Sequence, residues 1–245
     1  MACIRRGTVR VDSGRFWEVD ALRGVAVVMM VVYHLAWDLH YFGYYPGSVT
    51  AGLWGLFQSA TLINFVFLAG VSLWLSYARQ GRVRFGWYAN RGLKLLGWGF
   101  LITLVTGLLL KEGTVFFGVL HLIGLAAVCA YPFLRLGLAN LFLGLGLIAL
   151  GNCFGRVPVG FPHLLWLGLC PPGLYMVDYV PLVPWFGVVL LGVCAGFLFY
   201  PGGKRLLRLK ETNNSPPVRL LAFLGRKSLF IYLIHQPVLF GLFSR

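Results

Sequence analysis

Long apolar segments recur along nearly the whole chain, and they limit the folds that it can adopt. A helix needs about 20 mostly apolar residues to cross the hydrocarbon core of a bilayer. Seven segments come close to this length, at roughly 22–42, 53–77, 93–110, 114–134, 136–154, 181–200 and 226–243. The sequence therefore predicts an all-α fold, a polytopic integral membrane helix bundle with about seven transmembrane helices.

The composition supports a membrane protein with one domain. Of the 245 residues, 59% are hydrophobic and 11% are charged, whereas soluble proteins average about 45–50% and 25%. The polar stretch Pro201–Arg219 is too short for a second domain, so residues 1–245 are expected to form a single transmembrane domain. The apolar segment Phe161–Cys170 is too short to cross and is followed by two prolines and a glycine, which favours an interfacial or re-entrant piece.

The distribution of cations predicts the orientation. The formal net charge is +14, and cytoplasmic loops of membrane proteins carry such an excess of Lys and Arg. If the N-terminus is cytoplasmic, all but three of the 21 cations fall on the inner side; the exceptions are Lys111, Arg156 and Arg245. We therefore expect a cytoplasmic N-terminus, an odd number of spans and no nucleic-acid partner. The first apolar run exceeds a signal-peptide core and lacks a clear cleavage site, so it is expected to be retained as a span.

The cysteines give no sign of a metal site or a disulfide framework. There are five, scattered along the chain without a CxxC spacing: Cys3, Cys129, Cys153, Cys170 and Cys194. Such a pattern indicates neither a zinc site nor a set of bridges. We expect no bound metal and no tightly bound cofactor.

The first apolar segment carries four ionisable residues on one helix face. At about 100° per residue, His34 returns to within about 20° of Arg23, and Asp38 follows one turn later. Asp20 lies about five whole turns before Asp38. A charged residue at the centre of a membrane helix costs roughly 2.5–3.5 kcal/mol, so this stripe should face protein rather than lipid. The alternative interpretation is that His34 and Asp38 only hydrogen-bond a neighbouring helix.

Three histidines are expected at similar depth in the bilayer. At about 1.5 Å per residue, His34, His121 and His235 all fall near the midplane of a core about 30 Å thick. Together with Asp20 and Asn64 they could line a polar substrate chamber. Each of them could instead make a packing hydrogen bond between helices, as intramembrane polar side chains commonly do.

The chemistry of this chamber centres on His34. Histidine is the side chain best suited to proton transfer near neutral pH. A carboxylate bonded to its second nitrogen would fix the tautomer and stabilise the imidazolium, and Asp38 shares the face of His34. With no nucleophilic Ser or Cys nearby, the pair favours activation of a hydroxyl or an amine of the substrate. His34 and Asp38 are the predicted catalytic residues.

Basic residues gather at the inner mouths of the first and third segments. They are Arg15, Arg23, Arg91 and Lys94. Such a cluster binds phosphate groups through charge-assisted hydrogen bonds, which would suit the phosphates of an acyl-CoA. The positive-inside bias alone also produces basic clusters at these positions.

Several motifs in order match a known family. The opening runs Arg15-Phe-Trp-Glu-Val-Asp20-Ala-Leu-Arg23-Gly24 and is followed by His34 and Asp38. Further matching pieces are Asn64-Phe-Val-Phe-Leu-Ala-Gly70-Val-Ser72, Tyr88-Ala-Asn-Arg91, Gly118-Val-Leu-His121, Val180-Pro-Leu-Val-Pro-Trp-Phe-Gly187, Leu224-Gly-Arg-Lys-Ser228 and Tyr232-Leu-Ile-His235-Gln-Pro237. Over roughly residues 15–240 the chain resembles the membrane acyltransferases that include the bacterial relatives of heparan-alpha-glucosaminide N-acetyltransferase. The spacing of Arg23 and His34, with ten residues between them, is also similar to that of the acyltransferase-3 superfamily.

The resemblance implies a membrane-bound acyltransferase and a role for each end of the stripe. Such an enzyme takes an acyl group, here acetyl, from cytosolic acyl-CoA as co-substrate. It passes that group to an amine or hydroxyl of an acceptor, often a carbohydrate, so glycan modification is implied. By position His34 matches the catalytic His of the family, and Arg23 matches the Arg that is paired with it. The implied location is the inner membrane of a bacterial-type cell.

Two other classes stay open at this point. Polar residues at the midplane also mark the pathways of transporters and of proton conductors, although no internal repeat of the transporter type is visible. A non-catalytic membrane subunit is the third class. The sequence leaves the oligomeric state open, with a homodimer among the options.

Overall fold

The computed structural model describes residues 15–79, 84–110, 112–154, 159–206 and 215–243. Within these ranges the chain is helical and holds no strand, only an isolated bridge between Gly113 and Met176. The α-helices are α1 Trp17–Tyr41, α2 Gly52–Arg79, α3 Phe85–Leu109, α4 Val119–Cys129, α5 Ala139–Phe154, α6 Leu182–Phe199, α7 Pro216–Arg226 and α8 Ser228–Phe243. Three short 3₁₀ helices connect them: η1 Pro132–Arg135, η2 Pro162–Leu164 and η3 Pro201–Gly203.

The predicted all-α membrane bundle is confirmed, with helices of two lengths. Each of the seven predicted segments contains one apolar helix. The helices α1, α2, α3 and α6 are long and apolar enough to cross a membrane by themselves, whereas α4, α5 and α8 have 11, 16 and 16 residues. The helix α3 begins at Phe85, eight residues before the predicted segment, because Asn90 and Arg91 lower the hydropathy of its first two turns.

The helices fall into two compact units. One unit joins the two ends of the chain and holds α1, α7 and α8, within residues 1–45 and 211–245. The other holds α2 to α6, within residues 46–210. The organisation as a single domain stays a prediction.

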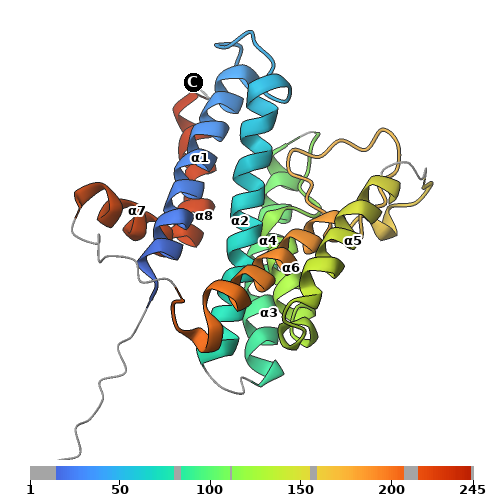
Figure 1. Ribbon diagram of the computed structural model, residues 1–245. Coiled ribbons are helices and arrows are strands. Elements are labelled where there is room, and N and C mark those ends of the chain that lie inside the picture. The colour runs from blue at the N-terminus through green and yellow to red at the C-terminus, as the bar shows by residue number, and fades with distance from the viewer. Residues whose placement is uncertain (1–14, 80–83, 111, 155–158, 207–214, 244–245) are drawn as a thin grey trace, which may run out of the picture. The chain divides into compact units, whose positions relative to one another are not determined.

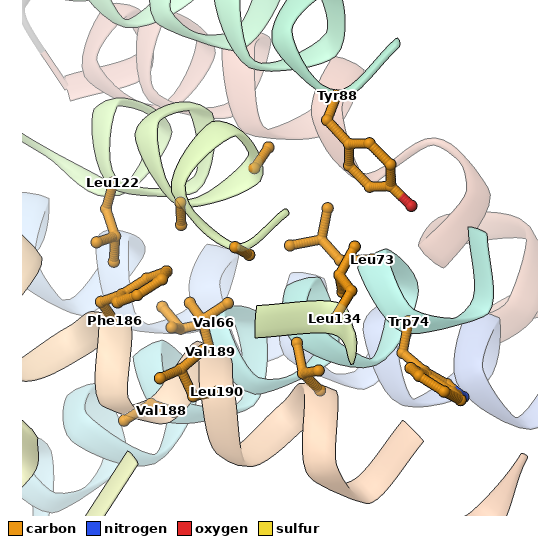
Figure 2. Packing of buried hydrophobic residues seen from close by; sticks show 14 of the residues in the cluster. Val66, Leu73, Trp74, Tyr88, Leu122, Leu134, Phe186, Val188, Val189 and Leu190 are labelled. Carbon is orange, nitrogen blue, oxygen red and sulfur yellow. The ribbon is translucent and has the colours of Figure 1, made fainter. Parts of the chain in front are cut away.

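The larger unit is built around α6. This helix packs along α5 on one side and α2 on another, and α4 in turn packs on α3. Apolar side chains of α2, α4 and α6, among them Val66, Leu122 and Val189, meet in the core (Figure 2). Tyr88 of α3 is fully buried at the edge of the same cluster. In a membrane bundle, van der Waals packing of this kind is a main source of attraction between helices.

The short apolar segment Phe161–Cys170 does not form a spanning helix. It contains η2 and a turn, and it folds back onto the start of α6. The backbone N–H of Leu182 donates to the carbonyl of Trp166 at 2.8 Å, and the Tyr179 hydroxyl donates to the carbonyl of Leu165 at 2.9 Å. These bonds satisfy backbone groups that would otherwise be left without partners.

The smaller unit contains a helix that the sequence analysis missed. The stretch Pro201–Arg219 was expected to be a polar linker, yet α7 begins inside it, at Pro216. Proline at the first helical position is favourable, because its missing N–H is not needed there. Small and apolar residues recur at the helical spacing, at Val218, Leu221, Ala222 and Gly225. Leu221 and Gly225 of this series lie against α1. This spacing was the sequence signal that could have predicted α7.

The contact of α7 with α1 is unusually close. A Cβ added to Gly24 of α1 would collide with the carbonyl oxygen of Leu221, and a Cβ added to Gly225 would collide with the carbonyl oxygen of Asp20. Small residues at such positions let two helix backbones approach. A single residue, Lys227, separates α7 from α8, which runs beside α1 (Figure 1).

Candidate functional site

The polar face of α1 meets α8 through two contacts that are one helix turn apart. Asp38 is fully buried, and its Oδ1 accepts a hydrogen bond from Nε2 of Gln236 at 2.8 Å. The ring of His34 packs edge to face against the ring of His235, with centroids 4.7 Å apart. The structure thus brings together three of the predicted site residues, His34, Asp38 and His235, and adds Gln236 to them.

Both imidazoles of this cluster are held in the same tautomer. Nδ1 of His34 lies 2.9 Å from the carbonyl oxygen of Met30, and Nδ1 of His235 lies 2.8 Å from that of Tyr232 and 3.2 Å from that of Ile231. A carbonyl oxygen only accepts, so each neutral ring carries its proton on Nδ1. Nε2 of each ring is then left with a lone pair that can take a proton or attack a carbonyl carbon.

The Met30 carbonyl occupies the position that we had expected for a carboxylate. A carboxylate at the second nitrogen of His34 would act as the Asp of a catalytic triad does, and the sequence placed Asp38 on the same helix face without placing it against the ring. In the structure the backbone holds that nitrogen, and the Asp38 carboxylate turns to Gln236. Asp38 lies four residues from His34 on the same helix, so its charge can still favour the imidazolium through space.

Gln236 is the residue that sequence reasoning missed. It follows His235 and precedes Pro237 in an apolar helix. An amide in such a helix is costly unless it finds a partner, which was a signal that it meets another polar group. The sequence could not name Asp38 as that partner, because the two residues are 198 positions apart.

The other end of the stripe is an ion pair. Nη1 of Arg23 lies 3.1 Å from Oδ1 of Asp20, and Asp20 is buried beside the close contact between α1 and α7. Arg15 is exposed just before α1 begins. Asp20 lies fourteen residues before His34, or about 21 Å along the helix. It therefore lies with Arg23 and not beside the two histidines.

His121 belongs to the larger unit and has local partners there. It is 2% exposed, and its Nδ1 accepts a hydrogen bond from the backbone N–H of Gly118 at 3.2 Å. Nε2 faces the Thr103 hydroxyl at 3.4 Å, and the ring stacks on Phe117. Gly118 is the residue just before α4, and accepting from the N–H of that residue helps to cap the helix. His121 thus has the opposite tautomer from His34 and a structural explanation for its position.

The remaining predicted residues also lie in the larger unit. Asn64 is half-buried on α2 and Lys94 is exposed on α3. The Arg91 guanidinium lies over the ring of Trp87, 5.6 Å from its centroid, which is a cation–π contact. The convergence of Arg91 and Lys94 with the cations of the smaller unit stays a prediction. Among the described residues, no group of three or more His, Cys, Asp or Glu is arranged to hold a metal ion.

A comparison with known families identifies one match. The family model described as heparan-alpha-glucosaminide N-acetyltransferase, catalytic, matches residues 15–237. This range takes in both units and every residue of the candidate site. No curated protein and no solved structure matches the chain.

Proposed function

Because the chain belongs to the heparan-alpha-glucosaminide N-acetyltransferase catalytic family, we propose that it moves an acetyl group from cytosolic acetyl-CoA to an amine or hydroxyl of an acceptor. The membership and the apolar helices make it a membrane enzyme of the N-acetyltransferase kind. The acyl-CoA donor, a carbohydrate acceptor and a multi-pass location in a bacterial inner membrane belong to the proposal.

The observation that carries the proposal is the free Nε2 of His34. The Met30 carbonyl fixes the tautomer, so this nitrogen is a base within a polar cluster between two apolar helices. It removes the proton of the acceptor N–H or O–H while the acceptor atom attacks the thioester carbonyl. The C–S bond then breaks, and the CoA thiolate takes the proton back from the imidazolium. Transfer through an acetyl-imidazole would use the same lone pair, so both routes require His34.

The binding site for the CoA part of acetyl-CoA is proposed to lie at the basic residues near the inner end of α1. Arg15 and Arg23 of the smaller unit would hold the CoA phosphates, because charge-assisted hydrogen bonds to phosphate are strong and Arg matches phosphate geometry. Arg23 lies about 16 Å along α1 from His34. The thioester would reach His34 through the extended arm of acetyl-CoA, while the Asp38 charge favours the imidazolium.

The test is acetyl transfer by the purified full chain in detergent. Binding of acetyl-CoA is measured by calorimetry, and transfer of a labelled acetyl group to D-glucosamine is measured by mass spectrometry. We expect His34→Ala to lower kcat by roughly 10²–10⁴-fold, the usual contribution of general acid–base catalysis, with acetyl-CoA affinity nearly intact. His163→Ala is the matched control, since His163 is exposed on η2, and it should behave like the wild type.

Two results would overturn the proposal. The first is a protein that binds no acetyl-CoA. The second is solute or proton flux into proteoliposomes that runs without acetyl-CoA and is lost in His34→Ala, because that would make the chain a transporter. An unchanged kcat in His34→Ala would leave the stripe as a packing feature only.

A further inference from the structure

The cluster between α1 and α8 contains three buried polar atoms without a hydrogen-bond partner among the described residues. They are Oδ2 of Asp38, Oε1 of Gln236 and Nε2 of His235. Asp38 is fully buried and His235 is 8% exposed. Buried polar atoms are nearly always paired, so three in one cluster require an explanation.

All three atoms are hydrogen-bond acceptors. The second oxygen of a carboxylate only accepts. One N–H of the Gln236 amide donates to Asp38, and the carbonyl oxygen of the same amide has no partner among the described residues. Nδ1 of His235 donates to backbone carbonyls, so Nε2 offers a lone pair. Each of these three acceptor atoms therefore lacks a donor, which a bound molecule could supply.

We propose that Asp38, His235 and Gln236 form the subsite that binds the acyl acceptor through its N–H and O–H groups. This inference rests on the proposed function and adds a positioning residue to it. The bond from Gln236 fixes Oδ1 of Asp38, which leaves Oδ2 for the acceptor, and His235 of the same subsite is in ring contact with His34. A ligand with only acceptor atoms cannot pair with these three atoms, whereas the N–H and O–H groups of a polyhydroxyl amine can.

The subsite also separates the two substrates along α1. The phosphates of acetyl-CoA match the cations near Arg23, and the acceptor's donors match the oxygens near Asp38. The cations near Arg23 do not pair with the donors of the acceptor, and the oxygens near Asp38 repel the phosphates of acetyl-CoA. The two substrates therefore bind on opposite sides of His34. Specificity for the acceptor then depends on the number of its donors rather than on its size.

The distinguishing variant is Asp38→Asn. It is isosteric, and an amide at this position still forms one hydrogen bond with Gln236, so the tie between α1 and α8 is kept. It also places an NH₂ group in the subsite, which no longer consists of acceptors alone. The double variant Asp38→Asn with Gln236→Glu keeps the tie and returns the second oxygen. A role in packing alone predicts no difference among the three proteins.

Acetyl transfer to D-glucosamine and to cyclohexylamine is measured for each protein, together with the apparent melting temperature. Cyclohexylamine has the amine and a six-membered ring but no hydroxyl donors. We expect the wild type to prefer D-glucosamine by about 10- to 100-fold in kcat/KM. In Asp38→Asn the KM for D-glucosamine should rise by about the same factor, with the melting temperature unchanged. The double variant should reverse at least a tenth of this rise in KM. The control Gln58→Glu, at an exposed glutamine of α2, should leave all values unchanged.

The outcomes separate this inference from the proposed function. A wild type that transfers acetyl to neither amine refutes the proposed function, and the subsite falls with it. A wild type that transfers acetyl equally well to both amines overturns the subsite alone. An Asp38→Asn variant with unchanged KM also overturns it, as does a double variant that recovers nothing.

Discussion

The close contact between α1 and α7 can be tested by adding one methyl group. Alanine at Gly24 would place its Cβ against the carbonyl oxygen of Leu221, well inside van der Waals distance. A flexible side chain could rotate away from this methyl, but a helix carbonyl cannot. The two helices must therefore move apart, and the substitution is overpacking in its least avoidable form.

The expected cost follows from two opposing effects. Overpacking typically destabilises by about 1–3 kcal/mol, and a clash of backbone atoms belongs near the upper value. Replacing a helical glycine by alanine recovers about 1 kcal/mol of helix propensity. The net loss is about 2 kcal/mol, which for a chain of this size lowers the melting temperature by about 4–8 °C.

The assay is thermal unfolding of the purified full chain in detergent, followed by circular dichroism. The control is Gly97→Ala on α3, where the added Cβ meets nothing within 4 Å. That variant should melt at the same temperature as the wild type or up to a few degrees higher, because it gains propensity without a clash. If Gly24→Ala melts within one degree of the wild type, or if Gly97→Ala loses as much stability, the explanation by close contact is wrong.

Two further predictions address the donor end and the topology. Arg23→Ala should raise KM for acetyl-CoA while kcat is largely kept, because a phosphate contact is common to ground and transition states. Arg23→Lys should recover part of the lost affinity for acetyl-CoA. A fall in kcat alone would contradict the assignment of Arg23 to the CoA phosphates. A reporter that fluoresces only in the cytoplasm should stay dark when it is fused after Phe243. An odd number of spans with a cytoplasmic N-terminus puts the C-terminus outside. Bright cells would indicate an even number of spans.

The sequence was sufficient to predict the fold class and the polar face of α1. Both depend on periodic patterns, which are local: hydropathy marks the helices, and the 100° turn per residue places His34 and Asp38 on one face. Neither pattern says which helix covers that face. The partner proved to be α8, at the far end of the chain, because the fold joins the two ends into one unit.

The shared depth of three histidines was a weaker guide. Depth fixes a position along the membrane normal and leaves the lateral position open. His34 and His235 are in ring contact, but His121 lies in the other unit and accepts from the N–H of Gly118 at the start of α4. This local contact explains the position of His121, and an argument from depth does not consider it.

The same contact at Gly24 has a consequence for the site. Only Lys227 separates α7 from α8, so a shift of α7 away from α1 also moves the start of α8. The polar contacts of α8 with α1, at His235 and Gln236, begin about two turns later and depend on that start. Gly24→Ala should therefore lower acetyl transfer even well below its melting temperature, whereas a purely thermal defect would vanish on cooling. If transfer at 10 °C or more below the melting temperature equals that of the wild type, then α8 is held by its own contacts and α7 only contributes stability.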